Sequence, residues 1–360
     1  MSGFSLPRVI VTTCGTSALT NSASIELRGY ISRYANARTP EDVSDKPTRQ
    51  RLQAHIEERK QQFAAQTEIG QLKKLSAELN GLLSLYDNRP PSGRDQHFLI
   101  CTDTWLGEAT AQLVQGYLER CGQAVQLQRI TDLQTGSLAG FQMAMAELVR
   151  WCAETLPGWG EAGHQVSFNL TGGFKSVQGV MQILAQFYAD EAVYVFESGD
   201  ELLRLPRLPV RMAAEDTLRE HLPVFRRMAC LNTPITATQA EGIPDTLLMQ
   251  IDGQATLSVW GELVWREQYK ALYREKLWES PSPKLRFGPK FMTSVQDLPP
   301  NRLETVNTRV DDLCRQLETG QALGRLDLKG LQGNPRPPST HECDAWHDGD
   351  ARRLYGHYEE

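Results

Sequence analysis

Residues 171–176, Thr-Gly-Gly-Phe-Lys-Ser, combine glycine, hydroxyl and lysine chemistry in one short turn. The turn follows an apolar run ending at Leu170 and precedes an apolar pattern at helical spacing over residues 177–188. Two glycines let backbone N–H groups point into a concavity, and a helix start adds partial positive charge to that of Lys175. Such a turn suits phosphate. The alternative is an ordinary strand-to-helix connection, since neither the G-x-x-x-x-G-K nor the G-x-G-x-x-G spacing is present.

Two further turns of small polar residues follow predicted strands: Thr13–Ser17 after residues 9–12, and Thr102–Thr104 after residues 98–101. Strands alternate here with helices of ten or more residues, which predicts a parallel α/β sheet whose ligands bind beyond the carboxyl ends of the strands. Three turns at such ends favour a phosphate-bearing ligand. The predicted ligand-binding residues are Thr13, Gly15, Thr16, Ser17, Thr102, Asp103, Thr104, Thr171, Gly172, Gly173, Lys175 and Ser176.

A second chemically capable group lies near the end of the sequence, where three of the seven histidines fall within the last 20 residues. The set suits RNA cleavage by the 2′-hydroxyl, which needs a base, a cation at the phosphate and an acid for the departing 5′-oxygen. Aromatic rings there can stack on a splayed base. The predicted catalytic residues are Arg353, His357, Tyr355, His341, Lys329 and Arg336. On a strand, residues 353, 355 and 357 share one face, opposite Leu354.

Two features weigh against this catalytic interpretation. The last 80 residues hold eleven Lys/Arg against twelve Asp/Glu, so this part is not basic. Arg352 and His357 also form R-x-x-x-x-H, which resembles the motif of helical HEPN ribonucleases. Because Asp348-Gly349 predicts a hairpin between strands, the helical alternative is disfavoured.

The length and composition limit the number of domains and the classes of partner that the chain is expected to have. A chain of 360 residues predicts two or three domains, and the net charge of −6 gives no global nucleic-acid signal. The seven cysteines include no C-x-x-C, so no disulfide framework, zinc site or other metal site is indicated, and a reducing cytoplasm fits best. There is no apolar run of 18 residues and no signal-peptide pattern, so no membrane partner is expected.

The elements predict three domains. Residues 1–205 are predicted to form a Rossmann-like parallel α/β domain with a helical insertion at about 24–90. A proline-containing edge strand or extended link at 202–210 closes this domain. Residues 206–280 read as a winged helix-turn-helix, with a hairpin at Asp252-Gly253; a packing or dimerisation module is the alternative. A linker at Ser280–Pro283 leads to a small α+β domain, 281–360. Its predicted elements are strands at 285–292, 326–331, 340–346 and 352–358, and a helix at 301–318.

The first 205 residues resemble CARF domains, the CRISPR-associated Rossmann-fold sensors, in the segments 13–21, 102–104 and 169–176. The following stretch, with residues 257–262 (Leu-Ser-Val-Trp-Gly-Glu), is similar to the winged helix that often follows a CARF domain. The last part resembles RelE-type mRNA interferases, through residues 328–331 and 352–355. Together the three parts resemble the CRISPR-associated CARF–winged helix–RelE mRNA interferases.

This resemblance implies a homodimer that binds cyclic oligoadenylate, expected to be cyclic tetra-adenylate, across its two-fold axis as an allosteric activator. Binding would release or reorient the RelE-like units, which would cut mRNA in the ribosomal A site as metal-independent endoribonucleases needing no cofactor. Lys175 and the Ser17 turn match positions that hold the cyclic phosphates, and Arg353 matches an arginine of the penultimate strands.

One departure from the RelE pattern matters. Such folds usually continue into a further strand with another arginine and a terminal tyrosine, whereas this sequence ends at Glu360. Either His341, His357 and Tyr355 replace those groups, or the chain is truncated and inactive. The second hypothesis is favoured, and a native gene product that ends at Glu360 by mass spectrometry would refute it.

Two other functions stay open. A CARF–winged-helix transcription regulator with an inert tail would bind promoter DNA with a steep salt dependence and would not need Arg353. A ring nuclease would degrade the cyclic ligand, lose that turnover in Lys175→Ala and leave RNA intact.

Overall fold

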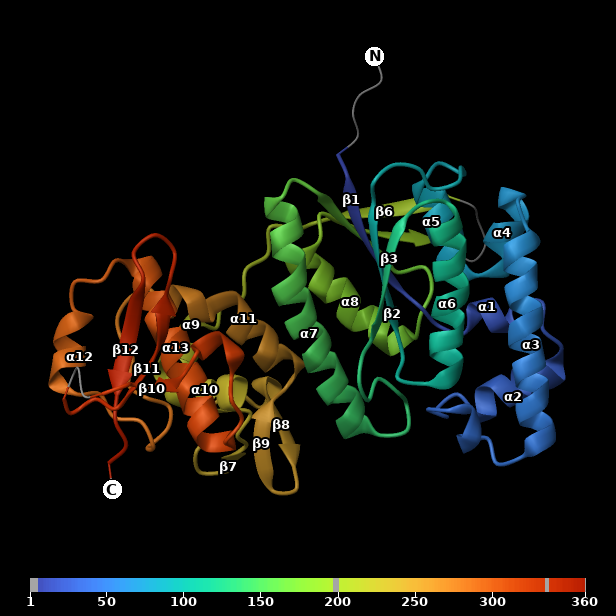
Figure 1. Ribbon diagram of the computed structural model, residues 1–360. Helices are drawn as coiled ribbons and strands as arrows, with labels where there is room; N and C mark the ends of the chain where they lie inside the picture. Colours follow the sequence, from blue (N-terminus) through green and yellow to red (C-terminus); the bar gives the residue numbers. More distant parts are fainter. Residues whose placement is uncertain (1–5, 197–200, 334–336, 360) are drawn as a thin grey trace, which may run out of the picture. The chain divides into compact units, whose positions relative to one another are not determined.

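The computed structural model describes residues 6–196, 201–333 and 337–359. The chain forms two compact units, Met1–Arg211 and Met212–Glu360 (Figure 1). The first corresponds to the predicted sensor domain with a boundary six residues later. Apart from residues 206–211, the two smaller predicted domains, 206–280 and 281–360, lie together in the second unit.

The first unit is built on a six-stranded sheet in the order β3-β2-β1-β4-β5-β6. The strands are β1 (Arg8–Thr13), β2 (Gln96–Cys101), β3 (Ala124–Arg129), β4 (Gln165–Asn169), β5 (Glu191–Val195) and β6 (Leu202–Pro206). The first five run parallel, and β6 pairs antiparallel with β5 at the edge. The Rossmann-like sheet and its edge strand were therefore predicted correctly.

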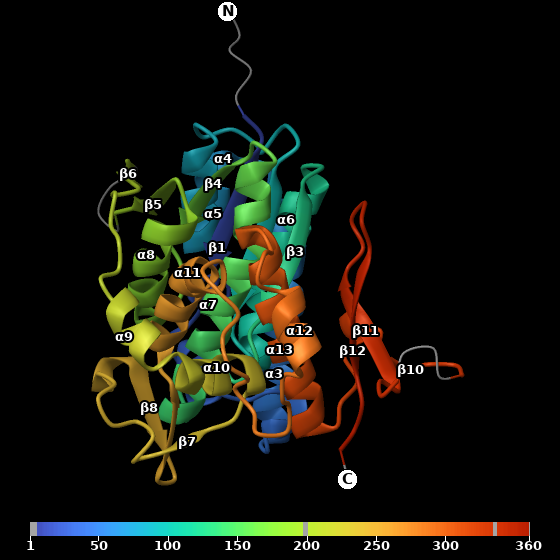
Figure 2. The same cartoon turned by 90° about the vertical axis from the view of Figure 1, so that its left-hand side faces the viewer.

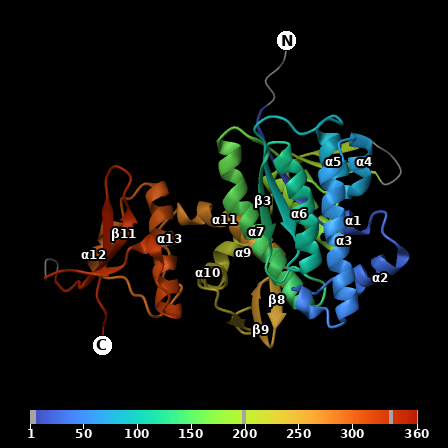
Figure 3. The ribbon, with the colours of Figure 1, turned by 45° about the vertical axis from the view of Figure 1, so that its right-hand side comes forward.

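Helices cover both faces of this sheet (Figure 3). The helices α5 (Ala77–Leu85) and α6 (Trp105–Arg120) pack on one face, and α7 (Leu138–Glu161) and α8 (Lys175–Tyr188) pack on the other. Their amphipathic spacing was the signal in the sequence, because each buries an apolar stripe on the sheet.

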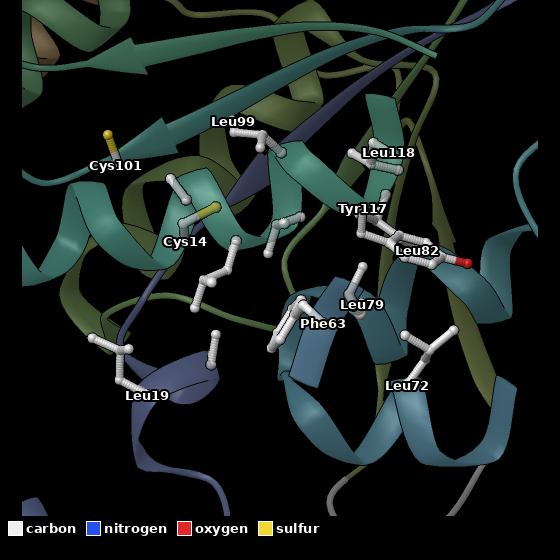
Figure 4. Packing of buried hydrophobic residues seen from close by; sticks show 14 of the residues in the cluster. Cys14, Leu19, Phe63, Leu72, Leu79, Leu82, Leu99, Cys101, Tyr117 and Leu118 are labelled. Carbon is white, nitrogen blue, oxygen red and sulfur yellow. The ribbon is translucent and has the colours of Figure 1, made fainter. Parts of the chain in front are cut away.

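The predicted insertion is helical: α2 (Ile25–Arg33), α3 (Lys46–Ala65), α4 (Ile69–Leu75) and α5, after the short α1 (Ser17–Thr20). Thr39 precedes only the 3-10 turn η1 (Pro40–Asp42). The long helix starts at Lys46, where Asp45 accepts from the Thr48 N–H at 3.0 Å. Phe63, Leu72 and Leu79 pack with Leu99 of β2 in one buried cluster (Figure 4). The insertion is thus packed against the domain rather than protruding from it.

At the amino ends of β1 and β2 lies a buried polar network. Arg8 Nη2 is 2.9 Å from Asp95 Oδ2, Tyr86 donates to the same oxygen at 2.7 Å, and His97 Nε2 is 3.0 Å from the Tyr86 hydroxyl. His97 has no exposed surface. Burial lowers the pKa of His97 to about 4, reinforced by Arg8 and opposed by Asp95.

This histidine predicts a pH dependence of stability. Between about pH 6.5 and 4 the unfolded chain protonates His97 while the folded chain does not, so acidification favours unfolding with a slope of about 1.4 kcal/mol per pH unit. The measurement is urea unfolding of wild type and His97→Gln across this window. The glutamine amide does not titrate, so the slope of the unfolding free energy against pH should be smaller in the variant by about 1.4 kcal/mol per pH unit. An unchanged slope would show that His97 is not the group responsible.

The second unit begins with two helices and a small sheet. The helices are α9 (Glu215–Glu220) and α10 (Leu222–Leu231), which are separate because Pro223 cannot continue a helix from α9. The sheet has the order β7-β9-β8, with β7 (Ile235–Thr236), β8 (Leu248–Ile251) and β9 (Gln254–Leu257); η2 (Asp245–Leu247) precedes β8 and α11 (Val259–Tyr273) follows β9. Asp252 and Gly253 both have positive φ, 49° and 78°, which confirms the predicted hairpin turn.

The rest of this unit places an antiparallel sheet beside a long helix. The elements are α12 (Pro289–Ser294), α13 (Pro300–Thr319), η3 (Gly324–Leu326), β10 (Lys329–Gly330), β11 (His341–Trp346) and β12 (Arg352–Gly356), with the strand order β10-β11-β12 (Figure 2). The strand predicted at 285–292 is wrong: irregular chain there leads into α12, whose first residue is a proline, a preferred helix start. Arg352 lies on a strand, so the helical HEPN motif is not formed.

The predicted linker Ser280–Pro283 is packed rather than flexible. Ser282 is buried and donates to Glu318 of α13 at 2.5 Å. Nearby, the buried Arg226 of α10 donates through Nε to Asp311 of α13 at 2.8 Å, and Asn307 Nδ2 donates to the Tyr273 carbonyl at 3.0 Å. Buried polar contacts therefore join α10, α11 and α13 across the expected domain boundary.

No helix among the described residues is both long and apolar enough to cross a membrane.

Candidate functional site

The three turns predicted to bind ligand follow β2, β1 and β4, which are neighbours in the sheet. The chain runs from β1 toward β3 on one side and from β4 toward β6 on the other, so the strand order switches between β1 and β4. Ligands of open α/β sheets bind beyond the carboxyl ends of the strands at such a switch. The Thr13–Ser17 and Thr171–Ser176 turns touch each other, because a Cβ built on Gly15 would lie 3.1 Å from the Gly173 Cα.

The two glycines of the Thr171–Ser176 turn, Gly172 and Gly173, have neighbours too close to leave room for a side chain. Gly173 has φ of +106°, and a Cβ there would lie 2.9 Å from the Thr13 Cβ. A Cβ on Gly172 would lie 2.4 Å from Glu78 Oε1. Thr13 in turn donates to the Gly172 carbonyl at 2.5 Å. The turn has the close backbone approach that its sequence predicted, but part of the concavity is filled by the protein itself.

The group that fills it is Glu78, at the start of α5. Its side chain has no exposed surface, and its Oε1 accepts from the Gly15 N–H at 2.8 Å. Its Oε2 accepts a short hydrogen bond from Ser17, whose oxygen accepts from the Ala77 N–H at 2.9 Å. Gly15 and Ser17, which the sequence analysis predicted to bind the ligand, therefore donate hydrogen bonds to an internal carboxylate. Glu78 could not be found from the sequence, because it lies more than 60 residues from its partners, on an unremarkable helix.

The Thr102–Thr104 turn makes several hydrogen bonds within the protein. The buried Thr104 caps α6 by accepting from the Gly107 N–H at 3.2 Å, and its hydroxyl is 2.8 Å from that of Thr102. Asp103 accepts from Arg129 Nε at 2.7 Å and from the Asp132 N–H at 3.1 Å. Partial burial opposes ionisation of Asp103, but these hydrogen bonds and Arg129 lower its pKa overall. The side chains of Thr102, Asp103 and Thr104 thus all have internal hydrogen-bond partners in this structure, and their contact with a ligand stays a prediction.

Three predicted residues, Thr171, Gly173 and Lys175, line a pocket of about 650 Å³. The exposed Lys175 begins α8, where backbone N–H groups lack helical partners. The sequence analysis did not identify the rest of the lining: Leu170, Gln178, Gln182, Tyr194, Val195, Phe196, Leu203 and Leu205. Apart from Thr171 and the glutamines its walls are largely aromatic and aliphatic. Thr16 and Ser176 are not among the lining residues; Thr16 precedes α1 and Ser176 is exposed beside Lys175.

This pocket can hold a ligand with an anionic and a flat apolar part. The Lys175 ammonium and the start of α8 attract an anion. Tyr194 and Phe196, from β5 and its end, offer aromatic surface, and the exposed fraction of Phe196 is 56%. Gln178 Nε2 donates to the carbonyls of Leu170 and Gly172, at 2.9 and 3.0 Å, and so fixes the shape of the turn. Within the described chain, no group of three or more His, Cys, Asp or Glu side chains is arranged to hold a metal ion.

In the second unit, strand pairing places three predicted catalytic residues on one face. Tyr355 and Lys329 are both register partners of Glu342, and Arg353 is the partner of Asp344. Directly paired residues share a face, so Lys329, Arg353 and Tyr355 lie on the same side of the sheet. Arg353 forms ion pairs with Glu342 and, at 3.7 Å, with Asp344, while Lys329 is 2.5 Å from Asp327. Carboxylates thus accompany both cations, a feature that the sequence analysis missed.

His341 does not join this face. His341 shares its face of β11 with the buried Cys343 and Ala345, which is the face opposite Glu342 and Asp344. Its ring centroid is 5.0 Å from that of Tyr358. His357 follows the end of β12 and is exposed. Arg336 lies outside the described residues. The predicted cluster is therefore divided between two faces, and the face with Arg353 is the better candidate for phosphate chemistry.

Comparison with known proteins adds one finding. Residues 73–208 match the model of a family described as CRISPR-associated protein (Cas_APE2256). The match covers less than half of the chain, lies within the first unit and includes Glu78, the Thr102–Thr104 turn and the Thr171–Ser176 turn. No curated protein matches the chain. This part of the chain is thus similar to a CRISPR-associated family.

Proposed function

We propose that this chain is a sensor-effector of CRISPR defence, in which cyclic oligoadenylate activates a ribosome-dependent endoribonuclease. The observation that carries the proposal is the pocket at Lys175, which lies at the carboxyl end of the sheet, within the range that matches the CRISPR-associated family. Its combination of one cation, a helix N-terminus and aromatic walls suits a phosphodiester joined to adenine.

The cyclic ligand, expected to be cyclic tetra-adenylate, would bind between the first units of a homodimer. A two-fold symmetric ring presents each protomer with the same half, so one pocket per protomer meets the requirement of an isologous site. Thr171, Gly173 and Lys175 are the predicted ligand residues best placed for that contact.

For the effector, the chemistry proposed is attack of a ribose 2′-oxygen on the adjacent phosphorus. The P–O5′ bond breaks and the departing oxygen takes a proton from water, which leaves a 2′,3′-cyclic phosphate on one fragment and a 5′-hydroxyl on the other. Arg353 would stabilise the negative charge on the phosphate, and Tyr355 would stack on a base. A carboxylate beside Arg353, Glu342 or Asp344, is a candidate for the base that accepts the 2′-hydroxyl proton.

The buried contacts of α13 bear on how such an effector is switched. The expected release of the RelE-like part from the winged helix would break the Arg226–Asp311 pair, both members of which are buried. Release would also expose to water the apolar side chains of Val310 and Cys314 of α13, which are buried in one cluster with Leu231 of α10. A change that keeps residues 212–360 as one body therefore fits this chain better than detachment at residues 280–283.

The test is incubation of the full-length protein with translating ribosomes, with and without cyclic tetra-adenylate. The expected result is ligand-dependent cleavage of mRNA, mapped by primer extension, and no cleavage of the same mRNA free of ribosomes. Absence of any ligand-dependent cut would reject the effector half. Disappearance of the ligand instead, with intact mRNA, would indicate a ring nuclease.

A second function, transcription regulation through the winged-helix-like segment, is favoured by one observation. The face of Arg353 and Lys329 also carries Asp327, Glu342 and Asp344, so its carboxylates outnumber these two cations. A regulator would bind its own promoter DNA with an affinity that falls steeply with salt. Electrophoretic mobility shifts at two salt concentrations, with Arg353→Ala as an indifferent control, distinguish this function from RNA cleavage.

A further inference from the structure

A fully buried carboxylate occupies donors of the kind that a phosphate would use. Glu78 has no exposed surface, and both of its oxygens accept: one from the Gly15 N–H at 2.8 Å and the other from the Ser17 hydroxyl. An ionised carboxylate accepts in this manner at both oxygens. A backbone N–H at a glycine turn and a serine hydroxyl are also typical partners of a phosphate oxygen.

The Glu78 carboxylate lies next to Gly172, in the turn that precedes Lys175. A Cβ built on Gly172 would lie 2.4 Å from Glu78 Oε1, so the carboxylate touches the backbone of the Thr171–Ser176 turn. Among the residues that the structure describes, no lysine or arginine forms an ion pair with Glu78. Its negative charge is therefore compensated only by neutral donors, and its field extends into the adjoining pocket.

The insertion also holds the short helix α1 at its other end, independently of Glu78. Arg59 Nε donates to the Ala18 carbonyl at 2.6 Å, and His55 Nε2 is 2.8 Å from the Leu19 carbonyl. Both side chains are buried. Because these contacts anchor the segment after the Thr13–Ser17 turn, neutralising Glu78 should leave that turn in place.

We infer that Glu78 is an internal anionic competitor that sets the affinity of the sensor for its phosphate-bearing ligand. The inference rests on the proposed sensor function of this site. Glu78 occupies the Gly15 and Ser17 donors and repels an anion at Lys175, so the pocket responds only to a ligand that offsets both effects. Glu78 positions the turn and need not touch the ligand.

The experiment compares wild type with Glu78→Gln, whose amide can still accept from Gly15 while the charge is removed. Binding of cyclic tetra-adenylate and of inorganic pyrophosphate to the full-length protein is measured by titration calorimetry. A unit charge within several ångströms, at the effective dielectric of a partly buried site, predicts binding tighter by about tenfold or more in the variant. Lys175→Ala combined with Glu78→Gln should abolish the gain if it arises in this pocket.

Glu191→Gln is the matched control. Glu191 is also a buried carboxylate of the first unit, bound to Ser167 at 3.0 Å and to Arg204 at 2.8 Å, but it lies on β5, at the amino end of that strand. Its neutralisation should leave both affinities within about twofold, because it lies away from the pocket. Scanning calorimetry verifies that each variant folds, and Glu78→Met, of similar length, replaces the amide variant if that one does not.

The outcomes separate this inference from the function on which it rests. Tighter binding of both probes by the Glu78 variant supports both. Tighter binding of pyrophosphate alone, with cyclic tetra-adenylate bound by neither protein, supports the internal competitor and rejects the cyclic ligand. Unchanged or weaker binding in the folded variant, or no binding of either probe by any protein, overturns the inference.

Discussion

Replacing Asp311 by alanine is expected to destabilise the second unit by roughly 3–5 kcal/mol, the usual cost of removing one partner of a buried ion pair. Asp311 accepts from Arg226 Nε at 2.8 Å and also accepts a short hydrogen bond from Tyr273. Arg226 is only 1% exposed. Its guanidinium would lose its charged partner without gaining water. Urea unfolding followed by tryptophan fluorescence measures the loss, and fragment analysis after limited proteolysis assigns it to residues 212–360.

Glu304→Ala provides the matched control on the same helix. Glu304 is 2.6 Å from Arg274, so this pair also joins α13 to the end of α11, but the Arg274 side chain is 54% exposed. Removal of this surface pair should cost about 1 kcal/mol or less. Combining Asp311→Leu with Arg226→Met should recover most of the loss, since an apolar pair often replaces a buried ion pair without cost. Equal effects of Asp311→Ala and Glu304→Ala would contradict the role given to burial.

Replacing Lys175 by alanine is expected to weaken binding of cyclic tetra-adenylate at least a hundredfold, and with it ligand-dependent cleavage. Lys175 is the cation in the lining of the pocket, and it begins α8. Two symmetric sites in a dimer would lose two charge-assisted contacts at once, each worth about 1.5–3 kcal/mol. Titration calorimetry gives the affinity, and the ribosome assay gives the cleavage.

Arg353→Ala is the comparator for Lys175→Ala. Because Arg353 lies in the second unit, its loss should abolish mRNA cleavage and leave the affinity for cyclic tetra-adenylate unchanged. Lys175→Ala should lose both. If Lys175→Ala binds the ligand as wild type does, the pocket beside the Thr171–Ser176 turn is not the sensor.

The sequence by itself determined the architecture of the first unit. Alternating apolar runs and helical stripes were sufficient to predict the parallel sheet, the helical insertion and the edge strand, because these patterns depend on local periodicity and on proline chemistry. The same local reasoning predicted the hairpin at Asp252-Gly253. It failed at residues 285–292, where a mixed segment with Arg286, Gly288 and Pro289 was assigned to a strand. The chain instead enters α12 at Pro289.

Local reasoning also placed the three polar turns at neighbouring strand ends, and the sheet order β2-β1-β4 confirms that they are adjacent. It could not show which residues of these turns have hydrogen-bond partners within the protein. That depends on partners distant in the chain: Glu78 for Gly15 and Ser17, and Arg129 for Asp103. The same is true of the pocket wall from β5 and β6, whose residues carry no motif.

In the second unit the tertiary structure decided both the domain division and the candidate catalytic face. A Ser-Pro-Ser-Pro segment has the composition of a linker, yet the buried contacts of Arg226, Asp311 and Asn307 join the helices on either side of it. Parity along one strand correctly grouped Arg353 with Tyr355. Only pairing with β11 brought Glu342 and Asp344 beside Arg353 and separated His341 from it. Periodicity specifies which side of its own strand a residue occupies, whereas the charges it meets are set by the register between strands.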